Sequence, residues 1–106
     1  MARLLSFLIA ALTLAWGPTA LAACGPGQPG STFRFPVADT GRSLVVHLPR
    51  GLDAARPSPL VFVLHGSGGT GEAILRDSRL ADTADRHGFI VVAPDAGIPV
   101  ERGFVW

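Results

Sequence analysis

Two runs of apolar, strand-forming residues lie on either side of a glycine loop and a segment of helical period, and this order constrains the fold most. The runs are residues 60–64 (LVFVL) and 89–93 (FIVVA). Neither run alternates apolar with polar residues, a pattern typical of central strands that are buried on both faces. Two such strands joined by a helix form a right-handed crossover unit of a parallel sheet. The sequence therefore predicts an α/β fold with parallel strands.

One helix is predicted between the two strands. It begins at Glu72, because an acidic residue is favourable in the first turn, and it ends at Gly88, which suits the position after the last turn. Ile74, Ala81 and Ala84 recur at roughly helical spacing and are expected to face the sheet. The opposite face is expected to be charged and exposed, with Arg76, Arg79, Asp82, Asp85 and Arg86.

The residues before the first apolar run predict an antiparallel hairpin. Residues 33–35 and 43–48 form its strands, and Asp39-Thr40-Gly41 between them is a turn sequence. Residues 49–59 predict a loop, whereas residues 97–106 have no period that assigns them to an element. A hairpin and one crossover unit cover only one face of each strand, so the apolar runs require a second helical layer and further strands. We therefore expect residues 42–106 to form an incomplete α/β domain.

The first 22 residues have the three parts of a secretory signal. Arg3 supplies the positive charge, residues 4–16 the apolar segment, and Ala20-Leu21-Ala22 the small-x-small cleavage site. The apolar segment is shorter than the roughly 20 residues that a membrane span requires. We expect residues 1–22 to be removed, residues 23–41 to form a flexible lead-in with the first strand, and the mature protein to be exported to the periplasm or the extracellular space.

The only cysteine, Cys24, directly follows the cleavage region. Residues 21–24 (LAAC) resemble a bacterial lipobox, in which this cysteine would carry a lipid anchor. A disulfide with a cysteine outside this chain is the alternative. The match to A-x-A favours ordinary cleavage, and contact with a membrane is expected only if Cys24 is lipidated.

The composition excludes several classes of partner. Nine basic and eight acidic residues form no basic patch and no acidic run, so neither nucleic acid nor an anionic membrane surface is expected to bind. Three histidines and one cysteine lack the spacing of metal ligands, so no metal site is predicted, and no cofactor is expected. The chain stops at Trp106 without a closing helix or polar tail, which is typical of a truncated gene product.

The glycine loop after the first apolar run, residues 65–71 (HGSGGTG), matches three templates. The first is the phosphate-binding P-loop, G-x-x-x-x-G-K-[ST]. Here Glu72 and Ala73 occupy the positions of its lysine and its hydroxyl residue. A carboxylate would repel the phosphates and no hydroxyl would remain for Mg²⁺, so the P-loop is excluded.

The second template is the dinucleotide-binding turn. Gly66, Gly68 and Gly71 match G-x-G-x-x-G, and Asp95 follows at a distance that suits a contact with a ribose. Export would separate the protein from the soluble nicotinamide pool, and a hairpin precedes the motif, which usually opens its domain. The dinucleotide hypothesis therefore stays open as the weaker alternative.

The third template is H-G-x-G-G, the oxyanion loop of an α/β-hydrolase. In that fold the loop after the third strand supplies one main-chain N–H to the oxyanion hole. Small residues let the backbone approach the developing negative charge closely. Residues 65–69 (HGSGG) directly follow the apolar run 60–64, with a hairpin before it to supply two leading strands. The third template therefore explains more of the context than the other two.

Four stretches of residues 42–106 resemble one protein family: RSLVVHLPRGL, PLVFVLHGSGGTGE, RLADTADRHGFIVVAPD and GFVW. They are similar to secreted bacterial esterases of the polyhydroxybutyrate depolymerase and feruloyl esterase-like group, in the α/β-hydrolase superfamily. The resemblance implies the N-terminal portion of an α/β-hydrolase sheet, and a Ser-Asp-His hydrolase whose full-length form acts on a polyester or an aryl ester. It also implies that Ser67 donates its main-chain N–H to the oxyanion, and that His65 and Gly66 shape the loop that Gly68 continues.

The nucleophile motif of that family, G-x-S-x-G, is absent from the 106 residues, and the nearest match, residues 41–45 (GRSLV), lacks the closing glycine. His47, His65 and His87 are expected to be structural or surface residues. Asp95 is expected to have a capping or loop role. The nucleophile, acid and base are therefore expected beyond this chain, and these residues alone are expected to be inactive. The alternative is an exported or lipid-anchored half-domain without catalysis.

Overall fold

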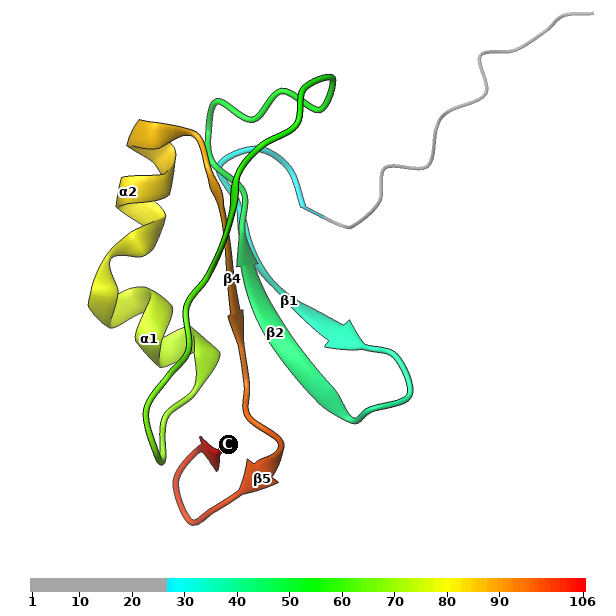
Figure 1. The fold of residues 1–106 in the computed structure, drawn as a ribbon, viewed down its shortest axis with the longest axis vertical. Helices are drawn as coiled ribbons and strands as arrows, with labels where there is room; N and C mark the ends of the chain where they lie inside the picture. The colour runs from blue at the N-terminus through cyan, green and yellow to red at the C-terminus, as the bar shows by residue number, and fades with distance from the viewer. Residues whose placement is uncertain (1–26) are drawn as a thin grey trace, which may run out of the picture.

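The computed structural model describes residues 27–106, so the predictions for the signal segment and for Cys24 lie outside the described residues. Four strands form one mixed sheet in the order β1-β2-β4-β3, and two shorter strands pair separately (Figure 1). The predicted α/β class is confirmed. In chain order the elements are β1 (Thr32–Val37), β2 (Arg42–His47), β3 (Leu60–Phe62), α1 (Gly71–Ser78), α2 (Leu80–His87), β4 (Ile90–Pro94), β5 (Ile98–Pro99) and β6 (Phe104–Val105).

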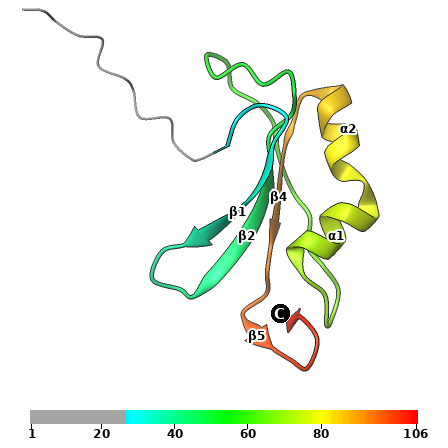
Figure 2. The same ribbon diagram turned by 180° about the vertical axis from the view of Figure 1, so that it is seen from behind.

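The predicted hairpin and the predicted crossover unit are both confirmed. β1 and β2 pair antiparallel across a turn in which Asp39 and Gly41 have positive φ angles of 61° and 66°. β4 then pairs antiparallel with β2 on one side and parallel with β3 on the other. Because the chain passes from β3 through both helices to β4, the two helices lie on the same side of the sheet (Figures 1 and 2).

The single helix predicted from Glu72 to Gly88 was wrong, because the structure breaks it at Arg79. Arg79 adopts the left-handed conformation, with φ 54°, and its N–H donates to the carbonyl of Arg76. Leu75 and Ala84 are both buried against the sheet, although nine positions apart. At 3.6 residues per turn an unbroken helix would place these two residues on opposite faces. The break at Arg79 therefore lets the side chains of Leu75 and Ala84 both face the sheet.

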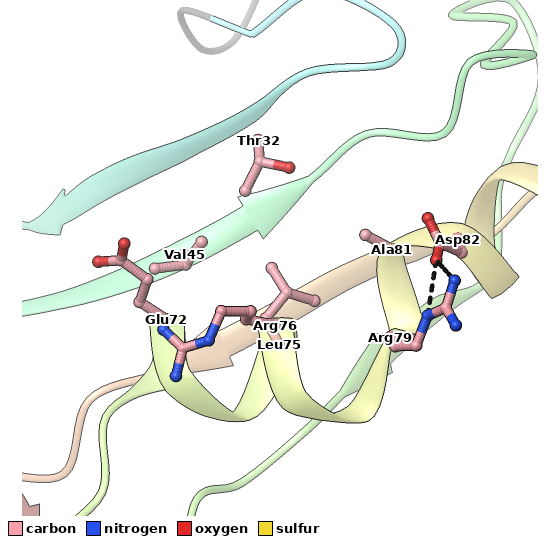
Figure 3. Close-up of a pocket in the computed structure, with 8 residues that line it drawn as sticks. All are labelled: Thr32, Val45, Glu72, Leu75, Arg76, Arg79, Ala81 and Asp82. Carbon is pink, nitrogen blue, oxygen red and sulfur yellow. Dashed lines mark hydrogen bonds and ion pairs between the residues drawn. The ribbon is translucent and has the colours of Figure 1, made fainter.

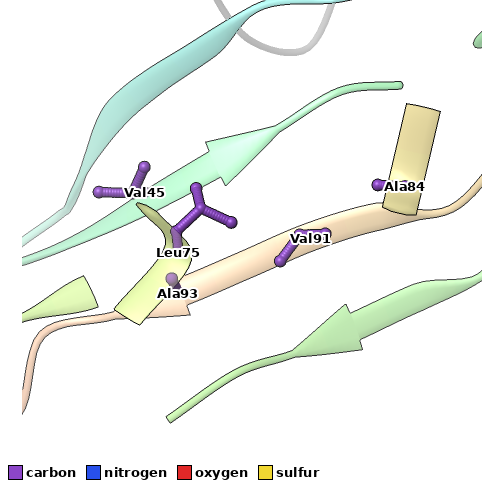
Figure 4. Packing of buried hydrophobic residues seen from close by; sticks show 5 residues of the cluster. All are labelled: Val45, Leu75, Ala84, Val91 and Ala93. Carbon is purple, nitrogen blue, oxygen red and sulfur yellow. The ribbon is translucent and has the colours of Figure 1, made fainter. Parts of the chain in front are cut away.

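The core lies between the two helices and the sheet. Five residues form it, and Ala84, Val91 and Ala93 are fully inaccessible to solvent (Figure 4). Gly88 ends α2 in the left-handed conformation, as predicted, with φ 73°. Full burial of one valine or leucine side chain contributes about 1.5–3 kcal/mol. The five residues of the core are Val45, Leu75, Ala84, Val91 and Ala93.

The prediction that residues 60–64 form a central strand, buried on both faces, was wrong for the described part of the chain. β3 is an edge strand there, and Leu60, Phe62 and Leu64 are 53%, 61% and 60% exposed. The reason is that residues 27–106 place both helices on one face of the sheet and no strand beyond β3. The other face carries an open apolar groove of about 390 Å³. It is lined by Gly27, Phe33, Phe35, Leu44, Val46, Leu48, Leu60, Phe62, Ile90 and Val92.

Residues 97–106, for which the sequence predicted no element, form a second small hairpin. β5 and β6 pair antiparallel, with Val100 donating its N–H to the carbonyl of Gly103 at 3.1 Å. Gly69 of the glycine loop forms an isolated bridge with Phe104. The hairpin therefore packs against the glycine loop. Neither α1 nor α2, the helices of residues 27–106, has the length and apolar character that a membrane crossing needs.

Candidate functional site

The glycine loop lies between β3 and α1, at the edge where the parallel strands β3 and β4 both end. In α/β sheets this carboxyl edge is where ligands bind. Gly66, Ser67 and Gly68 are exposed there, whereas His65 is only 4% exposed. The C-terminal hairpin lies beside the same edge (Figure 1). All four residues that the sequence singled out thus share one position in the fold.

His65 is held by contacts on both ring nitrogens and on one ring face. Its Nε2 accepts the N–H of Ala96 at 3.0 Å, so the ring proton is on Nδ1, which donates to the carbonyl of Gly66 at 2.7 Å. The ring stacks on Trp106, with centroids 4.9 Å apart and 28° between the planes. Both nitrogens are therefore engaged, and neither is available as a general base. His65 shapes the loop through its side chain.

The main-chain N–H groups of the loop divide into two pairs. Gly68 donates to the carbonyl of Phe104 at 2.9 Å, and Gly69 donates to the carbonyl of Gly66 at 3.0 Å. The N–H groups of Gly66 and Ser67 have no hydrogen-bond partner among residues 27–106. Both residues are exposed, so these two donors face solvent at the carboxyl edge of the sheet. Main-chain N–H groups without a protein partner are the kind of donor that can bind a negatively charged oxygen.

Asp95 follows β4 at the same edge and is 6% exposed. Its Oδ1 accepts the N–H of Gly71 at 2.7 Å, and its Oδ2 accepts the hydroxyl of Ser43 at 2.8 Å and a guanidinium N–H of Arg34 at 2.6 Å. Burial raises the pKa of Asp95, but these three hydrogen bonds, with the charge of the guanidinium, outweigh burial and hold that pKa below its ordinary 3.8. Asp95 thus joins the β1–β2 hairpin, β4 and the start of α1.

These contacts bear on the dinucleotide hypothesis. Asp95 is only 6% exposed and both its carboxylate oxygens already accept hydrogen bonds from protein groups, so the side chain is not presented to a ribose. The Gly71 N–H, which a pyrophosphate at the start of α1 would need, is also occupied. The structure therefore favours the capping role over ribose binding for Asp95.

His47 and Asp85 form a partly buried pair that the sequence analysis missed. Asp85 was predicted on the exposed helix face, but its side chain is 16% exposed and its Oδ1 lies 3.0 Å from Nε2 of His47. The hydrogen bond from His47, together with that from the Arg50 N–H and the charge of Arg50, lowers the pKa of Asp85 below 3.8. The His47 Nδ1 contacts the hydroxyl of Thr32, its cross-strand neighbour, at 2.8 Å.

The sequence holds a signal that His47 needs a partner, although it does not identify that partner. A histidine in an apolar strand must find hydrogen-bond partners when the strand is buried, and Asp85 is an acidic residue of the helix predicted to cover it. The order hydroxyl, imidazole and carboxylate is also that of a hydrolase triad. Here the carboxylate is shared with Arg50 and ties the loop after β2 to α2. We assign this group a structural role.

A groove of about 410 Å³ lies between the β1–β2 hairpin and the two helices (Figure 3). Its rim carries an exposed ion pair between Arg79 and Asp82, at 3.0 Å. None of its lining residues belongs to the glycine loop, so the groove and the loop are separate features. It is lined by Thr32, Val45, Glu72, Leu75, Arg76, Arg79, Ala81 and Asp82.

No metal site is found in the described residues, where no three His, Cys, Asp or Glu side chains gather. His87 lies exposed in the last turn of α2.

Comparison of the sequence with known protein-family models and with curated proteins found no match. The functional inference therefore depends on the residues and geometry of the glycine loop.

Proposed function

We propose that the glycine loop is the oxyanion loop of an exported carboxylic ester hydrolase of the polyhydroxybutyrate depolymerase and feruloyl esterase-like group. Residues 42–106 would then be the N-terminal portion of its α/β-hydrolase domain. One observation carries the proposal. The exposed N–H of Ser67, the residue that the resemblance places at the oxyanion, has no partner among residues 27–106.

The chemistry needs such donors because attack on an ester turns the carbonyl oxygen into an oxyanion. An N–H already aimed at that oxygen stabilises the transition state without reorganising, and each donor contributes on the order of 3 kcal/mol. A substrate would be polarised by the Ser67 N–H while a serine from a G-x-S-x-G turn attacks its carbonyl carbon. That serine, its histidine and its acid come from polypeptide outside these 106 residues, which contain no such motif.

Two features of the fold support this proposal. The loop follows the third strand, from which an α/β-hydrolase takes an oxyanion donor. The second sheet face and the outer edge of β3 are apolar and uncovered within residues 27–106, as a sheet that continues with more strands and a second helical layer requires. An isolated half-domain without catalysis, the alternative function, would leave this surface in water.

The test compares a substitution that removes the main-chain donor with one that keeps it. Ser67→Pro removes the N–H, whereas Ser67→Ala removes the hydroxyl and keeps the N–H. Both are made in the longer protein that the proposal requires, in which the reading frame would continue past the Trp106 codon to a G-x-S-x-G motif. We expect Ser67→Pro to lower kcat for p-nitrophenyl butyrate about 100- to 1,000-fold with little change in KM. Ser67→Ala should retain kcat within about threefold, well under one donor's contribution.

Three outcomes would contradict the proposal. One is a Ser67→Pro enzyme with full kcat and a native circular dichroism spectrum. Another is hydrolysis by the purified 106-residue chain that a serine-directed phosphonate abolishes, because the nucleophile would then lie within it. The third is a genomic sequence with no continuing frame, together with a monodisperse 106-residue product that melts cooperatively. That result would favour the non-catalytic half-domain.

A further inference from the structure

The C-terminal hairpin, β5–β6 with Trp106, holds the glycine loop through its carbonyl groups. The indole N–H of Trp106 donates to the carbonyl of His65 at 2.8 Å, and its ring stacks on the imidazole. The carbonyl of Gly66 accepts both the Nδ1–H of His65 and the N–H of Gly69. Two successive carbonyls of the loop, those of His65 and Gly66, are therefore both held by hydrogen bonds.

These contacts also determine the directions in which the free N–H groups point, because each peptide unit is planar. In a trans peptide the carbonyl and the following N–H point in opposite directions. When the carbonyl of His65 is bound to Trp106, the N–H of Gly66 points away from the indole. When the carbonyl of Gly66 is bound to the imidazole, the N–H of Ser67 points away from the histidine. Trp106 acts on the first carbonyl directly and on the second through the stacked ring.

The main chain of the hairpin completes the connection. Phe104 accepts the N–H of Gly68 at 2.9 Å and donates its own N–H to the carbonyl of Gly69 at 3.0 Å. Gly103 has a positive φ of 76°, and a Cβ there would overlap the carbonyl oxygens of Gly68 and Gly69. Only glycine lets the two segments approach this closely. The N–H of Gly68 is therefore bound to Phe104 and is not one of the free donors of the loop.

We propose that Trp106 is a positioning residue of the oxyanion loop. Through its contacts with His65 it turns the N–H groups of Gly66 and Ser67 outward, while the β5–β6 hairpin binds the N–H of Gly68. The inference rests on the proposed function for its chemical meaning, but its geometry is measurable without catalysis. It adds the Gly66 N–H as a second donor beside that of Ser67. It also gives the residues after β4 a role that their sequence did not indicate.

The test uses ¹⁵N NMR of the 106-residue chain and its Trp106→Ala and Trp106→Phe variants. In the wild type we expect the His65 ring nitrogens to show one protonated and one acceptor resonance, with Nδ1 protonated. The amide of Gly68 should be protected from hydrogen exchange, and those of Gly66 and Ser67 should not. Trp106→Ala should average the two ring signals and lower Gly68 protection about tenfold or more by local opening. Trp106→Phe keeps the ring stack and should retain the ring signature.

The control is the protection of Val91 and Val92 in β4, which should be equal in all three proteins. Unchanged ring signals and Gly68 protection in Trp106→Ala would overturn the proposal. If that variant does not fold, the wild type still decides, because a protected Ser67 amide would show that this donor faces inward. Failure of the proposed function would give a different result. The NMR observations would be as expected, but Ser67→Pro would leave kcat unchanged.

Discussion

Replacing Asp95 with asparagine changes one atom of a buried side chain that connects three parts of the fold. Asparagine keeps an oxygen for the N–H of Gly71, which is buried. Its amide group would then face the hydroxyl of Ser43 and the guanidinium of Arg34, and it lacks the negative charge that both now contact. The substitution therefore keeps the contact with α1 and removes the charge-assisted contacts with the β1–β2 hairpin.

The expected loss is about 2 kcal/mol in the free energy of unfolding. A hydrogen bond to a charged group contributes about 1.5–3 kcal/mol, and the Ser43 contact with the buried carboxylate belongs to this class. The side chain of Arg34 is 46% exposed, so its ion pair is screened by solvent and adds about 0–1 kcal/mol. For a domain of this size about 1 kcal/mol shifts Tm by about 4–8 °C. Asp95→Asn should therefore lower Tm by about 8–16 °C.

Urea and thermal unfolding, followed by circular dichroism at pH 7, measure this loss. The pKa of Asp95 in the folded state lies below its ordinary 3.8, so the stabilisation is fully present at pH 7 and is lost as pH falls below about 4. The difference between wild type and Asp95→Asn should therefore narrow below pH 4. Asp77→Asn is the matched control, because Asp77 is 64% exposed and, among residues 27–106, its side chain pairs only with Arg76. It should change stability by less than about 0.5 kcal/mol.

Either of two results would refute this account of Asp95. The first is an Asp95→Asn variant as stable as the Asp77→Asn control at pH 7, which would mean that the contacts with Ser43 and Arg34 contribute nothing. The second is a full difference that persists unchanged well below pH 4. In that case the charge of Asp95 would not be the source of the stabilisation.

Substitutions at two further positions test the path of the chain between β3 and β4. A Cβ at Gly71 would overlap the carbonyl of Ala93, so Gly71→Ala should lower the free energy of unfolding by about 1–3 kcal/mol; a urea titration that matches wild type would contradict this packing. Arg79→Val should cost about 1–3 kcal/mol, because a β-branched residue is strained at positive φ, whereas Arg79→Gly should not lower stability. A valine tolerated at wild-type Tm would show that the two helices are continuous.

Local patterns were enough to predict most of the secondary structure. The apolar run of β4, the turn at Asp39-Thr40-Gly41 and the helix end at Gly88 depend on residues close in sequence, and all were predicted within a few positions. The strand-loop-helix-strand order also placed His65, Gly66, Ser67 and Gly68 together after a strand. Each of these features follows from strand, turn or helix-end chemistry within a few residues.

Two features that the sequence analysis missed, the break at Arg79 and the inward position of Asp85, depend on contacts with other elements of the fold. The break at Arg79 follows from the demand that Leu75 and Ala84 face the same sheet. Asp85 turned inward because His47, 38 residues earlier, is buried beneath it. No pattern along one segment contains the position of its partner, so these pairings could not be read from periodicity.

The same division holds for the candidate site. The sequence by itself determined that a glycine-rich turn follows an apolar strand, because backbone freedom and strand preference are properties of the residues themselves. Only the tertiary structure decided which N–H groups of that turn are free. That choice depends on Trp106 and Phe104, which are brought to the loop by the packing of β5–β6 against it. Hydrogen bonds across 41 residues of chain, such as that from Trp106 to His65, exist only once the fold has closed.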